Sequence, residues 1–113
     1  MQKTQHKNLA DGKWAELSFV EQMGNVGSEV GRAISWQRRG DNERMRKALD
    51  RAFELIDLTA GDGRWTGGLR LREILRSREV LADYFFGNNF YRTIPEKLER
   101  YYYYFAYAAR KER

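Results

Sequence analysis

Apolar residues recur along the chain at the three-to-four-residue spacing of helices that bury one face. Clusters of glycine, aspartate and asparagine interrupt this spacing near residues 40–42, 61–68 and 87–89. No run alternates apolar and polar residues as a half-buried strand would. The pattern therefore predicts four helices, over about residues 13–37, 42–59, 69–86 and 94–110, joined by short loops.

These four segments predict an all-α protein, an antiparallel up-down four-helix bundle. Its 113 residues suit a single domain that spans residues 1–113, with a short polar tail over residues 1–12. Residues that favour helix starts precede three of the segments: Asp11 or Gly12 before the first, Asp41 or Asn42 before the second, and Thr93 with Pro95 and Glu96 in the pattern of a capping box before the fourth.

The first predicted helix carries three glycines on its apolar half, Gly24, Gly27 and Gly31. Inside a helix each costs about 0.8–1 kcal/mol relative to alanine, so a compensating contact is expected. Close approach of a neighbouring helix would supply it, which makes these residues structural. A phosphate-binding glycine loop is the alternative, but the spacing matches neither known glycine motif for nucleotides.

The third predicted helix places a cation, Arg78, in the middle of its apolar face. Burial of an unpaired guanidinium is costly, so Arg78 should meet a carboxylate, with Glu29 and Glu79 as candidates. The pair would be structural and fix the helix register. Alternatively, it belongs to a polar pocket or to a contact between subunits.

Several apolar and aromatic residues fall outside the predicted inward faces. They are Val80 and Tyr84 in the third helix and Tyr103, Tyr104 and Tyr107 in the fourth. Exposed tyrosine beside arginine is typical of protein interfaces and also of surfaces that stack nucleic-acid bases. We therefore predict that the five residues form a partner surface in a homo-oligomer, with base stacking or simple exposure as the alternatives.

The chain has few of the side chains that enzymes most often use in catalysis. There is no cysteine, and the one histidine, His6, lies in the polar tail. Thiolate metal sites and thiol nucleophiles are therefore excluded, and imidazole catalysis nearly so. The carboxylates of the second helix alternate with cations at helical spacing and suggest a solvated, paired face. We expect no catalytic residue, no metal site and no cofactor.

The charge balance favours an acidic partner. The net charge is +5, with 21 lysines and arginines, and its excess lies toward the C-terminal end. Arginine makes bidentate phosphate contacts, so RNA or DNA is a reasonable partner. The candidate phosphate-binding residues are Arg70, Arg72, Arg76, Arg100, Arg110 and Lys111. No apolar run is long enough for a membrane span or signal peptide, which predicts a cytoplasmic protein without a membrane partner.

An arginine-rich third helix, LRLREILRSREVL, and an aromatic, basic end complete a basic four-helix pattern. The chain thus resembles the small helical-bundle superfamily that includes proteins encoded in intervening sequences of large-subunit ribosomal RNA genes and the accessory variability determinant of diversity-generating retroelements. The resemblance implies a positively charged, barrel-like homo-pentamer that binds a reverse transcriptase and RNA during mutagenic cDNA synthesis, without catalysis. No binding residue is transferred by motif. A helical scaffold or adaptor that binds only protein remains the alternative function.

Overall fold

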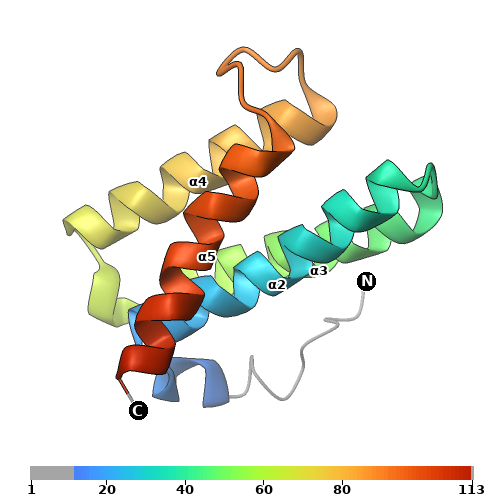
Figure 1. The fold of residues 1–113 in the computed structure, drawn as a ribbon. Coiled ribbons are helices and arrows are strands. Elements are labelled where there is room, and N and C mark those ends of the chain that lie inside the picture. Colours follow the sequence, from blue (N-terminus) through green and yellow to red (C-terminus); the bar gives the residue numbers. More distant parts are fainter. Residues whose placement is uncertain (1–11, 113) are drawn as a thin grey trace.

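The computed structural model describes residues 12–112 (Figure 1). Within this range the chain contains no strand, and its elements are η1 (Lys13–Glu16), α2 (Phe19–Arg38), α3 (Asn42–Ala60), η2 (Gly63–Trp65), α4 (Leu69–Phe86) and α5 (Pro95–Lys111). The prediction of an all-helical protein with four main helices is confirmed. Of the predicted polar tail only Gly12 is described, so His6 and the candidate cap Asp11 lie outside the described residues.

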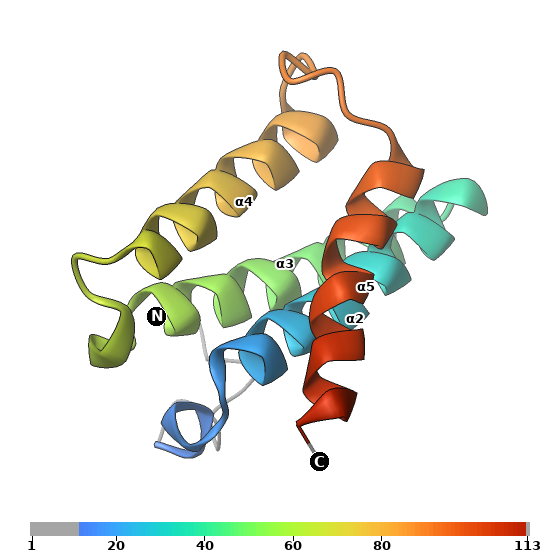
Figure 2. The ribbon, with the colours of Figure 1, turned by 60° about the vertical axis from the view of Figure 1, so that its left-hand side comes forward.

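Helix α2 is the central element of the fold. It runs antiparallel to α3 and packs closely on both α3 and α5 (Figure 1). Helix α4 packs on α3 and η2 over a smaller area, and it lies apart from α5 when the molecule is turned (Figure 2). Within the described residues no helix is both long and apolar enough to cross a membrane. The tightest packing is thus around α2, and α4 is held mainly from one side.

The predicted first helix is divided into η1 and α2. Ser18 caps α2, because its Oγ accepts from the Glu21 N–H (3.2 Å) while Glu21 Oε1 accepts from the Ser18 N–H (3.0 Å). The chain before this capping box folds back and buries Trp14, whose indole N–H donates to Thr59 Oγ1 (3.0 Å). A continuous helix from residue 13 was a wrong prediction, since the reciprocal cap and the buried tryptophan both favour the break.

Two other helix starts test the predicted caps. Asp41 caps α3, with Oδ1 accepting from the Arg44 N–H at 3.0 Å, as one of the two alternatives predicted. Thr93 does not cap α5, which begins at Pro95 after an N-cap at Ile94. Instead, both backbone polar groups of Thr93 bind the side chain of Asn89, each at 2.9 Å. The predicted capping box is wrong because Asn89 holds Thr93 outside the helix.

The glycines of α2 show where α5 crosses it. A Cβ on Gly27 would lie 2.5 Å from Tyr102 Cβ, and one on Gly24 would lie 3.4 Å from Ala106 Cα. The close approach predicted for these two glycines is confirmed. At Gly31 a Cβ would meet no atom within 4 Å, so the prediction is wrong there. Crossing helices touch over a limited length and then diverge, which leaves Gly31 beside an open groove.

Two polar residues of α2, Gln22 and Glu29, lie in the interior, although at 100° per residue both fall on the half of the helix opposite its apolar residues. Gln22 is fully buried: its Nε2 donates to the Trp14 carbonyl and to Asp62 Oδ2, and its Oε1 accepts from Trp65 Nε1, all at 2.9 Å. Glu29 is also buried, and it pairs with Arg32 at 2.7 Å and with Arg51 at 2.8 Å. Every polar group of Gln22 is therefore used to join η1, α2 and the segment around η2.

The hydrophobic core receives little from α4. Its largest cluster is formed by Trp14, Phe19, Met23, Val26, Val30, Ile34, Ala52, Leu55, Ile56, Trp65, Ile74, Leu81, Leu98, Tyr102 and Phe105. Only Ile74 and Leu81 of this cluster come from α4. Leu75 lies next to Ile74 and within one turn of Leu71 on the apolar side that helical periodicity gives α4, yet it is about half exposed at 48%. The apolar face of α4 is thus wider than the surface that α3 covers.

Candidate nucleic-acid interface and the cavity between α4 and α5

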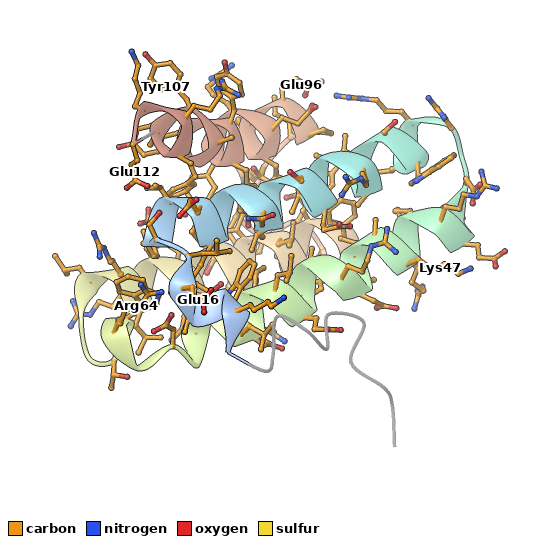
Figure 3. All side chains as sticks on the ribbon, turned by 90° about the horizontal axis from the view of Figure 1, so that it is seen from below. Glu16, Lys47, Arg64, Glu96, Tyr107 and Glu112 are labelled. Atoms are coloured by element: carbon orange, nitrogen blue, oxygen red, sulfur yellow. The ribbon has the colours of Figure 1, made fainter. Side chains whose placement is uncertain are left out.

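The outer side of α5 carries three exposed tyrosines. Tyr103, Tyr104 and Tyr107 are 58%, 64% and 46% exposed, and Tyr107 points away from α2 in Figure 3. Their spacing of three and four residues places them on one side of the helix. Tyr102 and Phe105, on the opposite side, are buried. The prediction that these three tyrosines lie outside the core is confirmed.

Cations lie among these tyrosines. The guanidinium carbon of Arg110 is 5.6 Å from the Tyr103 ring centroid, and its Nη2 lies 3.3 Å from Tyr103 Oη. Lys111 Nζ lies 5.4 Å from the Tyr107 ring centroid. Such distances are typical of cation–π contacts. Together with Arg100 and Tyr104, these residues define the α5 tyrosine face.

The charge of the α5 tyrosine face is not neutralised by neighbouring acids. None of its three cations, Arg100, Arg110 and Lys111, forms an ion pair with a carboxylate of residues 12–112. The contacts of Arg110 and Lys111 with tyrosine rings leave their charge in place. The face therefore presents positive charge and flat aromatic surface side by side.

The three candidate phosphate-binding arginines of α4 are not part of the α5 tyrosine face. Arg70 lies over the rings of Phe19 and Trp65, at 5.1 and 4.8 Å from their centroids. Arg76 lies 5.7 Å from the Tyr91 ring centroid, at the mouth of a cavity between α4 and α5. Arg72 is exposed. The structure thus separates the six predicted phosphate-binding residues into an α5 group and an α4 group.

Val80 and Tyr84 do not form an outward stripe. Tyr84 is half-buried, its Oη donates to Gln37 Oε1 (2.9 Å), and its ring packs edge-on against Phe85 with centroids 4.7 Å apart. Val80 is half-buried and packs against the core. Their assignment to an exposed partner surface is corrected. Side chains over a wide part of the circumference of α4 face the interior, some toward α3 and others, including Val80 and Tyr84, toward α5 and α2.

Arg78 has a carboxylate partner, as predicted, but a different one. Its Nε donates to Asp57 Oδ1 of α3 (2.9 Å), and its guanidinium carbon lies 5.1 Å from the Phe53 ring centroid. Both predicted partners are engaged elsewhere: Glu29 with two arginines, and Glu79 as acceptor for Tyr91 Oη (2.9 Å). Arg78 therefore ties α4 to α3 at a half-exposed position.

A second feature, which the sequence did not indicate, is a cavity of about 350 Å³ between α4 and α5. It is lined by Glu73, Arg76, Ser77, Val80, Thr93, Lys97, Leu98, Tyr101 and Tyr102. These residues come from two helices and the loop between them, and no local motif unites them. Ser77, a hydroxyl residue on the inward side of α4, is the one local irregularity that could have pointed to it.

The tyrosine hydroxyls of this cavity are strongly affected by burial. Tyr102 is 3% exposed, its hydroxyl has no hydrogen-bond partner among the described residues, and burial raises its pKa to about 12. Ser77 partly opposes this rise in the pKa, and its own hydroxyl donates to the Ile74 carbonyl (2.8 Å). Burial, together with the negative charge of Glu73, also raises the pKa of Tyr101. Both tyrosines are therefore neutral hydrogen-bonding groups at physiological pH.

No family model matches this chain, and no curated protein or solved structure matches it. Within the described residues, no group of three or more histidine, cysteine, aspartate or glutamate side chains is placed to hold a metal ion. The α5 tyrosine face and the cavity between α4 and α5 are therefore the features from which function is inferred.

Proposed function

We propose that this chain is a nonenzymatic accessory protein that binds single-stranded RNA through the α5 tyrosine face. The observation that carries the proposal is the position of three exposed tyrosines beside three cations that no described carboxylate neutralises. Unpaired bases stack on aromatic rings with little regard to sequence, at about 1–3 kcal/mol per base. Arginine and lysine beside the rings would contact the phosphates between those bases.

The resemblance to the accessory variability determinant extends this proposal to a partner enzyme. In this view the chain joins a reverse transcriptase to its RNA as a homo-pentamer of up-down four-helix bundles. Exposed apolar side chains near one another in the loop between α4 and α5 support a protein partner: Phe90, Tyr91 and Ile94 are 85%, 42% and 48% exposed. Apolar surface that is gathered in one place often marks a contact between proteins.

A helical scaffold that binds only protein is the second candidate. Tyrosine and arginine are among the residues most enriched in the energetic centres of protein interfaces, and the α5 tyrosine face contains both. In this case the positive charge serves solubility. The two candidates differ in one measurable respect: contacts with nucleic-acid phosphates release condensed counterions, so RNA affinity falls steeply and linearly with salt on logarithmic axes.

The test is a triple variant, Arg100→Gln, Arg110→Gln and Lys111→Gln, titrated against a labelled single-stranded RNA at several salt concentrations. If each cation binds a phosphate, the slope of log affinity against log salt falls by about 0.7 for each cation that is replaced. The control is the triple variant Lys13→Gln, Lys47→Gln and Arg92→Gln. It removes the same charge from exposed positions outside α5 and should leave most of the slope in place.

Replacement of Tyr104 and Tyr107 by serine separates stacking from protein binding. A stacking face loses about 1–3 kcal/mol per base in RNA affinity while the subunit mass in solution stays unchanged. A protein interface instead loses assembly at an unchanged salt slope. If the unmodified chain shows no salt-sensitive affinity for RNA in any oligomeric state, the RNA proposal is abandoned in favour of the protein scaffold.

A further inference from the structure

The cavity between α4 and α5 has the size and walls of a small-molecule site. Its volume of about 350 Å³ falls within the range of known ligand pockets, about 300–1,000 Å³. Val80 and Leu98 supply aliphatic walls, and the rings of Tyr101 and Tyr102 supply aromatic ones. A flat, mostly apolar molecule with one or a few rings would therefore fit between the two helices.

One of the residues that line the cavity carries a buried hydroxyl without a hydrogen-bond partner in the described chain. Tyr102 is 3% exposed and its Oη has no partner. A buried hydroxyl without a partner is unfavourable, and such groups in native proteins call for an explanation. Ser77 also lines the cavity, but no hydrogen bond joins its hydroxyl to Tyr102 Oη. Tyr102 could therefore donate to a guest that brings an acceptor oxygen.

The mouth of the cavity is positively charged. Arg76 and Lys97 are exposed, line the cavity and form no ion pair with a described carboxylate. Glu73 is the one acid among the lining residues, and it interacts with the Tyr101 hydroxyl. An anionic group of a guest would be favoured at this mouth, where it also keeps part of its hydration.

We propose that this cavity binds a small aromatic carboxylate with a second oxygen on the far side of its ring. The ring lies between the aliphatic and aromatic walls, the carboxylate meets Arg76 and Lys97, and the second oxygen accepts a hydrogen bond from Tyr102. The sparse packing of α4 against α5 leaves this cavity between them. None of these residues belongs to the α5 tyrosine face, so the test of this site does not depend on whether the chain binds RNA.

Three probes separate the parts of the proposal: 4-hydroxyphenylacetate, phenylacetate, which lacks the second oxygen, and 4-hydroxyphenylacetamide, which lacks the charge. Each is titrated into the full chain and followed by amide chemical shifts. We expect 4-hydroxyphenylacetate to bind saturably with the shifts confined to α4, α5 and their loop. Each of the other two should bind about tenfold more weakly, because each lacks one hydrogen bond or one ionic interaction.

The decisive variant is Tyr102→Phe, which removes the hydroxyl and keeps the ring. It should weaken 4-hydroxyphenylacetate to the affinity of phenylacetate and leave phenylacetate unchanged. Tyr103→Phe, which removes an exposed hydroxyl outside the cavity, is the matched control and should change neither probe. Arg76→Gln and Lys97→Gln should weaken both carboxylates and spare the amide, and they test the site even if Tyr102→Phe folds poorly.

Two results would overturn the proposal. One is the absence of saturable binding of all three probes at concentrations of about 10 mM, which would mean that the cavity takes no aromatic carboxylate. The other is binding that Tyr102→Phe and Tyr103→Phe reduce equally, which would place the probes elsewhere on the surface.

Discussion

Gly27 and Tyr102 mark the point where α2 and α5 come closest, since a Cβ on Gly27 would lie 2.5 Å from Tyr102 Cβ. Gly27→Ala should therefore destabilise the protein by about 1–3 kcal/mol, because the overlap exceeds the gain in helix propensity. Gly31→Ala, in the same helix but with no atom within 4 Å of its Cβ, should stabilise by about 0.5–1 kcal/mol. Urea unfolding of both variants measures the difference. If both variants were more stable than the unmodified chain, α5 would not be packed closely against α2 at Gly27.

Because of its buried hydrogen bonds, Gln22 should be one of the polar residues whose substitution lowers the stability of the protein most. Gln22→Leu leaves the indole N–H of Trp65 and the carbonyl of Trp14 without their buried partner, so we expect a loss of about 2–4 kcal/mol. The control is Asn25→Leu, at an exposed position of α2, which should change stability by less than about 0.5 kcal/mol. Equal effects in thermal unfolding would mean that the buried network contributes nothing.

Asp62 should make the protein sensitive to acid. Its hydrogen bonds with Arg64, and then with Gln22, lower the pKa of the carboxyl to about 2, against an ordinary value of about 3.9. The folded state therefore favours the ionised form. This contribution is fully present above about pH 4 and is lost as the pH falls toward 2.

Asp62→Asn should remove that part of the pH dependence. Stability measured by urea unfolding from pH 5 to pH 2 should fall less steeply in this variant than in the unmodified chain. Asp50→Asn, at an exposed position without an ion pair among the described residues, should leave the curve unchanged. Parallel curves for the unmodified chain and Asp62→Asn would contradict the assignment.

The pair between Arg78 and Asp57 should be worth little by itself. The two side chains are 43% and 58% exposed, and half-exposed pairs contribute about 0–1 kcal/mol. Arg78→Met should therefore keep the helix content and lower stability modestly, and a double-mutant cycle with Asp57→Asn measures the coupling. Subunit mass in solution should not change. A folded variant that no longer assembles would place Arg78 in a subunit interface.

The parts of this protein that the sequence predicts are those set by neighbours along the chain. The four helices, the cap at Asp41, and the exposure of Tyr103, Tyr104 and Tyr107 follow from periodicity and local capping, which act over three or four residues. The approach of α5 to Gly27 was also predictable, because several glycines on one apolar face of a helix need a compensating contact.

Only the tertiary structure decided the features that depend on distant partners. Gln22 looks like a solvent-facing residue until Asp62 and Trp65, 40 and 43 positions later, fold against it. The crossing of α2 and α5 leaves Gly31 open. The cavity lined by Tyr102 exists because α4 packs on α3 and leaves space between itself and α5. Helical periodicity states which side of each helix is apolar, whereas the angles between helices determine how much of that side is covered.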